Sequence, residues 1–168
     1  MFTLMATYGL RSNEVVSLTL DDIKWRERRL LIQQTKTRSA LELPLTEHVA
    51  AELIDYLQKV KRPERYREIF LRMRAPIGTL KRTAVTEAFQ AWSRRSGLAI
   101  PFQGAHCIRH SYAVHLLTEG TSLKTIGDLL GHKNAESTAV YLRLSTEDLR
   151  EVGLSVPCLD IKRREAEL

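Results

Sequence analysis

The sequence has few cysteines and no long apolar run, and both absences narrow the classes of protein to which it can belong. Only Cys107 and Cys158 occur in 168 residues, so reduced thiols in a cytoplasmic protein are expected rather than a disulfide framework. The longest uncharged stretch, residues 96–108, falls short of the roughly 20 apolar residues of a membrane helix. A basic and apolar leader with a small-residue cleavage site is also missing from the N-terminus. Neither a membrane protein nor a secreted protein is predicted.

The chain has too few acidic residues to balance its basic ones. The formal net charge is +6 and the pI is about 9.5, which favours an anionic partner: nucleic acid first, then an acidic protein or a membrane surface. The excess gathers in two stretches. Residues 59–82 contain nine Lys and Arg against two Glu, and residues 24–38 contain six against one. An ordinary solvated surface is the structural alternative for both.

The apolar pattern predicts an α+β fold: a mainly helical single domain with a small three-stranded antiparallel sheet. A composition of 43% hydrophobic residues can fill one sizeable core. Ser12 or Asn13 is expected to cap the second helix, which extends to Leu18, and Thr46 to cap the third. The expected strands are Ile23–Trp25, Leu30–Gln34 and Leu41–Leu45. The expected helices are Phe2–Leu10, Ser12–Leu18, Thr46–Val60, Arg82–Arg95, His106–Leu117, Ser122–Leu130 and Ala135–Leu142.

Six residues that can carry phosphate chemistry lie in short, distinctive segments. The segments are YGLRSNE, QQTKTRS, HCIRH and LLGHKNAESTAVY, and they contain Arg11, Lys36, His106, Arg109, His132 and Tyr141. His106 and Arg109 are three apart, so a helix presents both on one face. Because no set of Asp or Glu ligands accompanies them, this group suits phosphate chemistry that uses protein cations instead of a metal. No metal or cofactor is predicted.

Each of these signals also has a purely structural interpretation. Arg11 and Glu14 can form an ion pair at a helix start, His106 can be a capping residue, and Tyr141 can be a core aromatic with its hydroxyl at the edge. The segment Ser122–Leu142 can be a helix-turn-helix that reads DNA, which explains the positive charge but not the order of all six residues.

The ordered set resembles the tyrosine recombinases, the phage integrase family, from Tyr8 to about Leu144. YGLRSNEVVSL resembles the first arginine box, HCIRHSYAVHLL the HxxR box, and LLGHKNAESTAVY the final histidine and nucleophilic tyrosine. The resemblance implies the catalytic fold of that family and six catalytic residues, with Glu14 as a supporting carboxylate. The predicted DNA-binding residues, all within the two basic stretches, are Lys24, Arg38, Lys81 and Arg82.

The resemblance also implies a mechanism. Tyr141 attacks a scissile phosphate of double-stranded DNA, forms a 3′-phosphotyrosine and releases a 5′-hydroxyl, and a second 5′-hydroxyl then reverses the step. A free phenol is ionised only about once in a thousand at pH 7, so His106 is expected to take its proton. The remaining four residues act on the phosphate and the leaving group: Arg11, Arg109 and His132 hold the phosphate and Lys36 protonates the departing oxygen.

Domain organisation and assembly follow from the same resemblance. Residues 1–156 are expected to form the catalytic domain and residues 157–168 a tail, without the N-terminal core-binding domain that family members usually carry. Weak DNA binding and little complete recombination by this chain alone are therefore expected. A homotetramer on DNA is predicted, with the segment after Tyr141 docking on a neighbouring protomer or on its own domain.

Two other functions remain open on the sequence alone. A type IB topoisomerase-like nicking and closing activity uses the same chemistry, and a noncatalytic DNA-binding regulator can be built on the same fold. The target site and the mobile element or chromosomal system served are not encoded in these motifs.

Overall fold

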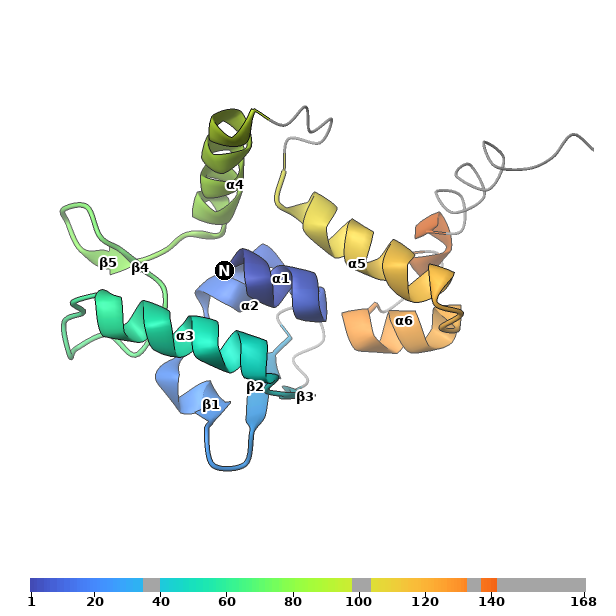
Figure 1. Ribbon diagram of the computed structural model, residues 1–168, viewed down its shortest axis with the longest axis horizontal. Helices are drawn as coiled ribbons and strands as arrows, with labels where there is room; N and C mark the ends of the chain where they lie inside the picture. Colours follow the sequence, from blue (N-terminus) through green and yellow to red (C-terminus); the bar gives the residue numbers. More distant parts are fainter. Residues whose placement is uncertain (35–39, 98–103, 133–136, 142–168) are drawn as a thin grey trace, which may run out of the picture.

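Helices and two small sheets make up the fold of the computed structural model, which describes residues 1–34, 40–97, 104–132 and 137–141 (Figure 1). Lys36 and Arg38 lie outside the described residues. Residues 137–141 are helical. The named elements are α1 (Phe2–Tyr8), α2 (Ser12–Val16), a 3-10 turn η1 (Leu20–Asp22), β1 (Ile23–Lys24), β2 (Arg29–Gln33), β3 (Ala40–Pro44), α3 (Glu47–Lys59), β4 (Leu71–Arg72), β5 (Gly78–Thr79), α4 (Arg82–Ser96), α5 (His106–Thr118) and α6 (Leu123–Leu130).

The three-stranded sheet is an antiparallel meander in the order β1-β2-β3. Leu30 and Ile32 of β2 are buried, and they pair with Leu43 and Leu41 of β3, because alternate residues of a strand face the same side. This apolar side contributes to the main core.

A tyrosine hydroxyl connects α1 to the junction of β3 and α3. The Tyr8 hydroxyl donates to the Pro44 carbonyl at 2.7 Å and accepts from the Thr46 N–H at 3.2 Å. Thr46 in turn caps α3 by accepting from the Val49 N–H. The register of the sheet edge and the start of α3 are therefore fixed relative to α1.

The apolar side chains form two clusters joined through α1. The larger unites α1, α2, the sheet and α3, while the smaller contains Ala113, Ile126, Leu130 and Tyr141. Figure 1 shows α5 and α6 side by side, with α1 next to α5, and α1 and α5 are in contact. The end of α1 is thereby placed beside α6.

The predicted fold class is confirmed, with local differences. Each strand of the larger sheet lies within one residue of its predicted bounds, and Trp25, expected in the first strand, lies beyond β1. No described helix is both long enough and apolar enough to span a membrane. The β4–β5 hairpin was not predicted, because strands of two residues each are too short to show an alternation of apolar and polar side chains.

The predicted cap of α2 was wrong. Arg11, rather than Ser12 or Asn13, is the N-cap, with an extended backbone at φ −76° and ψ 150°. Its own N–H donates to the Glu14 carboxylate at 2.8 Å, so the carboxylate three residues later satisfies the helix start in place of a Ser or Asn side chain. The helix also ends at Val16 rather than at Leu18.

We expect Gly9→Ala to destabilise the fold much more than Gly97→Ala. Both glycines follow a helix with positive φ, 64° and 69°, so alanine costs about 1–2 kcal/mol at either site. A Cβ at Gly9 would lie 2.5 Å from Tyr112 Cδ1, whereas at Gly97 it would meet no described atom within 4 Å. Overpacking at Gly9 adds about 1–3 kcal/mol. The free energy of unfolding in urea measures both, and equal losses would contradict the packing of α1 against α5.

Candidate active site

The C-terminal turn of α6 is the point where two arginine side chains meet. The helix ends at Gly131 in the left-handed conformation, φ 59°. The Arg109 Nη2 donates to the Leu130 carbonyl, and the Arg11 Nη2 donates to the Gly131 carbonyl at 3.1 Å. A helix C-terminus carries unpaired carbonyls and partial negative charge, so guanidinium groups bind it favourably.

Arg109 joins three helices from its position on α5. Besides the Leu130 carbonyl of α6, its Nη1 donates to the Gly9 carbonyl at the end of α1 at 2.6 Å. The side chain is buried, and burial together with the nearby charge of Arg11 lowers the pKa of Arg109 to about 10. The guanidinium is still charged at pH 7. It therefore places a buried cation beside α6.

Arg11 is held from its own helix by Glu14. The Arg11 Nη1 lies 2.9 Å from Glu14 Oε1, and the Glu14 side chain is almost fully buried. The same carboxylate caps the helix backbone, so one side chain fixes both the Arg11 backbone and its guanidinium. The predicted helix-start ion pair is confirmed.

The residues after α6 place His132 and Tyr141 together. The His132 N–H donates to the Gly127 carbonyl at 2.9 Å, and its Nδ1 lies 2.9 Å from the Thr138 hydroxyl. Thr138 is buried and is three residues before Tyr141 on the helical residues 137–141, so both share one face. The His132 and Tyr141 rings stack at 6.0 Å with 16° between their planes.

Tyr141 is buried within the smaller core cluster and contacts the arginines. Its side chain is 3% exposed, and its hydroxyl is hydrogen-bonded to the Arg109 guanidinium. Burial raises the pKa of Tyr141, against the opposing effect of Arg109 and Arg11. The phenol is therefore protonated at neutral pH. The burial of Tyr141 agrees with its interpretation as a core aromatic. Its hydroxyl has Arg109 as a partner.

His106 begins α5 and is exposed. Its ring folds back over Gly104, where a Cβ would lie 2.4 Å from His106 Nδ1, so a side chain at position 104 would displace the ring. Ala105, and not His106, is the N-cap residue, which makes the capping interpretation of His106 wrong. The His106 ring lies 5.6 Å from the His110 ring, which lies 5.4 Å from the Tyr141 ring.

The structure therefore brings most of the predicted site together. Contacts link five of the six residues, together with Glu14: Arg11, His106, Arg109, His132 and Tyr141. The position of Lys36 lies outside the described residues. Of the predicted DNA-binding residues, Lys24 is exposed on β1, Lys81 and Arg82 are exposed at the start of α4, and Arg38 is also outside the described part.

Three further residues belong to this site and were not assigned from the sequence. Thr138 holds the His132 ring, and His110 lies between the His106 and Tyr141 rings. Gln34, buried at the end of β2, lies against Gly131, where a Cβ would be 2.4 Å from Gln34 Oε1. The spacing of Thr138 from Tyr141 and of His110 from His106 is helical and is a usable signal. Gln34 gives no such signal, because its contact spans two distant elements.

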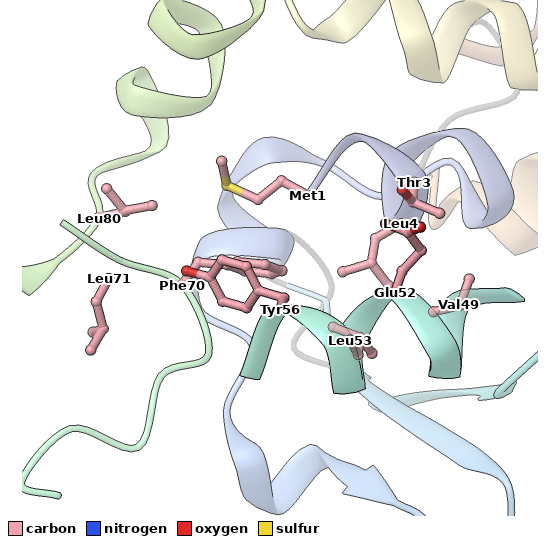
Figure 2. A pocket seen from close by; sticks show the side chains of 10 residues that line it. All are labelled: Met1, Thr3, Leu4, Val49, Glu52, Leu53, Tyr56, Phe70, Leu71 and Leu80. Carbon is pink, nitrogen blue, oxygen red and sulfur yellow. The ribbon is translucent and has the colours of Figure 1, made fainter. Parts of the chain in front are cut away.

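A cavity among the described residues lies away from this site. It has a volume of about 200 Å³ and lies between α1, α3 and the chain around β4 (Figure 2). Leu53, Tyr56 and Phe70 line it, together with Met1, and none of the six residues does. Within the described part of the chain, His, Cys, Asp and Glu side chains form no group of three that could hold a metal.

Comparison with known protein families identifies the family of this chain. The phage integrase family matches residues 1–148, which is most of the chain. The chain belongs to the phage integrase family. This confirms the resemblance carried by the arginine, histidine and tyrosine motifs.

The chain covers different shares of the relatives to which it is similar. It is 38% identical over 94% of its length to a protein named integrase/recombinase y4gC from Sinorhizobium fredii, and covers 82% of that protein. It is 36% identical to integrase/recombinase y4rA of the same organism but covers 38% of it. Tyrosine recombinase XerD of Bifidobacterium longum is 31% identical over 92% of the chain, which covers 52% of XerD.

Solved structures show the same fold. The crystal structure of XerA recombinase matches 89% of the chain with a TM-score of 0.73 and 21% identity, and the match covers 54% of that protein. The catalytic domain of bacteriophage HP1 integrase matches 90% of the chain with a TM-score of 0.59 and 20% identity, covering 77% of that domain. The expected catalytic fold is therefore confirmed.

Replacing Arg109 with lysine is expected to lower the free energy of unfolding by about 2–3 kcal/mol, measured in urea. Lysine has a single ammonium and cannot donate in a fork to both the Gly9 and Leu130 carbonyls, so a buried acceptor loses its charged donor. Arg29→Lys is the control, since Arg29 forms only an exposed pair with Glu42 and should leave the midpoint unchanged. A similar loss in both variants would contradict the structural role of Arg109.

Proposed function

We propose that this chain breaks and rejoins DNA in site-specific recombination, with Tyr141 as the nucleophile and a 3′-phosphotyrosine as the intermediate. One observation carries the proposal. The two guanidiniums, the His132 ring and the Tyr141 hydroxyl all lie around the C-terminal turn of α6. They are the donors and the nucleophile that phosphoryl transfer without a metal requires.

Arg11 and Arg109 are proposed to hold the nonbridging oxygens of the scissile phosphate. Each guanidinium has five N–H donors, and each uses only some of them on the carbonyls of Gly9, Leu130 and Gly131. Donors therefore remain for a phosphate, while the carbonyl contacts keep both groups preorganised. By analogy with oxyanion donors, each such contact is worth about 3 kcal/mol, or roughly a hundredfold in rate.

The Tyr141 hydroxyl is proposed to attack phosphorus as the bond to the 5′ oxygen breaks. Its raised pKa means that a proton must leave during attack, and His106 is the proposed acceptor. The departing 5′ oxygen takes a proton in turn, which we assign to Lys36. The second step reverses these transfers with another 5′-hydroxyl, so the phosphodiester is restored without hydrolysis.

His132 is proposed to donate a hydrogen bond to the same phosphate. Its Nδ1 is engaged by the Thr138 hydroxyl. When Nδ1 accepts from Thr138, the proton of a neutral imidazole is on Nε2, which is the donor form that the role needs. Thr138 thus orients the ring, and in this tautomer the donor is the Nε2–H.

The assignment of Lys36 is supported by Gln34. Gln34 is described two positions before Lys36, and it packs against Gly131, whose carbonyl accepts from Arg11. Gln34, the last described residue before Lys36, therefore lies beside the turn that Arg11 contacts.

DNA contacts are proposed at Lys24, Arg38, Lys81 and Arg82. Lys81 and Arg82 stand at the N-terminus of the 15-residue helix α4, where N–H groups and the helix dipole add to their charge. Lys81 also lines a groove with Tyr66 and Arg72. These cations suit the phosphates of a duplex.

The remaining features of the assembly are also proposals. We infer a homotetramer on double-stranded DNA in the cytoplasm, a catalytic domain over residues 1–156 and a tail over residues 157–168. A topoisomerase-like enzyme would relax supercoils through the same intermediate, whereas a recombinase exchanges strands between two sites. A noncatalytic regulator would form no covalent intermediate at all.

Tyr141→Phe is expected to bind duplex DNA as the wild type does and to form no covalent adduct. The substrate is a suicide duplex, nicked so that the 5′-hydroxyl fragment diffuses away after cleavage, and the adduct is seen as a shifted band on a denaturing gel. The loss follows because phenylalanine has no nucleophilic oxygen.

Tyr112→Phe is the matched control, because Tyr112 is a partly buried tyrosine of α5 beside the smaller core cluster. It should form the adduct at the wild-type rate, and mass spectrometry of the wild-type adduct should place the nucleotide on Tyr141. An adduct formed by Tyr141→Phe would disprove the nucleophile assignment.

The double variant Lys81→Gln, Arg82→Gln is expected to weaken DNA binding with a smaller salt dependence. Loss of two phosphate contacts reduces the slope of log K against log salt concentration by about 1.8, measured by fluorescence anisotropy. The control is Lys59→Gln, Arg67→Gln, which removes the same charge from cations already paired with Asp55 and Asp21. Equal slopes for the two double variants would refute the proposed contact surface.

A further inference from the structure

His110, the second histidine of α5, lies between His106, the proposed base, and Tyr141, the proposed nucleophile. His106 and His110 are four residues apart, so their rings project from the same face of the helix. The His110 ring packs nearly edge-on against His106, at 5.6 Å and 82°, and against Tyr141, at 5.4 Å and 62°. His110 is therefore the link between the exposed start of α5 and the buried tyrosine.

The Nδ1 of His110 does not account for the position of the ring. Its Nδ1 is buried and has no hydrogen-bond partner among the residues that the structure describes. Burial, together with the nearby charges of His106 and Arg109, lowers the pKa of His110, so the ring is neutral at pH 7. What the structure shows for this side chain is a flat, uncharged ring in contact with two other rings.

The Tyr141 ring is flanked by two histidine rings at different angles. The His132 ring stacks on it with 16° between the planes, and the His110 ring meets it at 62°. Stacking alone permits sliding in the plane of the ring, whereas a second ring at a steep angle opposes that movement. The direction of the Tyr141 hydroxyl is therefore set by both neighbours.

We propose that His110 is a positioning residue for DNA cleavage: its ring fixes the Tyr141 ring for attack. The proposal rests on the proposed cleavage by Tyr141. Attack on phosphorus requires a near-linear approach, and a displacement of about 1 Å can cost roughly a hundredfold in rate. The shape of the side chain, and not its nitrogens, carries the role.

Two substitutions separate shape from nitrogen chemistry. His110→Phe keeps a flat ring and removes both nitrogens, and His110→Ala removes the ring. The rate of adduct formation is measured in a single turnover with saturating enzyme on the suicide duplex, and DNA affinity by anisotropy. We expect His110→Phe to stay within about threefold of the wild-type rate and His110→Ala to be about 10- to 100-fold slower, with unchanged affinity in both.

A modified substrate tests whether the defect of His110→Ala lies in attack by Tyr141. A duplex with sulfur in place of the 5′ bridging oxygen has a leaving group that needs no proton. The His110→Ala defect should persist on this substrate, because attack by a misplaced Tyr141 stays slow. Recovery to the wild-type rate would place the defect in leaving-group protonation and overturn the proposal.

The remaining outcomes are also decisive. If His110→Phe is as slow as His110→Ala, a nitrogen of His110 is required, which contradicts the proposal. If His110→Ala cleaves at the wild-type rate, the ring is not required, which also contradicts it. If thermal melting shows that the alanine variant is unfolded, His110→Leu, apolar but not flat, replaces it with the same expectation. Absence of any wild-type adduct would refute the proposed function itself, and this role with it.

Discussion

The C-terminal turn of α6 is the constraint on which the rest of the site depends. Two successive carbonyls, of Leu130 and Gly131, bind guanidiniums that come from α5 and from the start of α2. His132 follows the left-handed Gly131, and its ring stacks on that of Tyr141. Because the two arginines repel each other, the carbonyls and the buried Glu14 carboxylate are needed to keep both charges together.

The contacts that stabilise the fold also hold the side chains of the proposed site. Arg109 joins the ends of α1 and α6 through the Gly9 and Leu130 carbonyls, and it also binds the Tyr141 hydroxyl. The ion pair of Arg11 with Glu14 and the burial of Tyr141 are ordinary structural features, and neither conflicts with a catalytic role. A preorganised site needs such supports, since its donors must be in place before the phosphate arrives.

Periodicity predicted the helices and the meander well, because α3 and α5 are long enough for their apolar spacing to be read. It did not predict Arg11 as a helix cap, since a carboxylate three residues later took over the usual capping function. The motifs named side chains that contacts connect around the end of α6, yet they did not indicate what holds them. The carbonyls of Gly9, Leu130 and Gly131 are backbone atoms, so no residue type in the sequence marks them. Gln34 reaches Gly131 only through the folded arrangement of the sheet and α6.

The central claim is that one DNA phosphate binds between the two arginines, His132 and Tyr141. The most direct test is a crystal structure of the protein with a nicked duplex and orthovanadate, which imitates phosphorus with five oxygen ligands. The account predicts vanadium bonded to the Tyr141 hydroxyl oxygen, with Arg11, Arg109 and His132 donating to its equatorial oxygens. Vanadate bound elsewhere, with the Tyr141 hydroxyl still on Arg109 and far from the duplex, would contradict it.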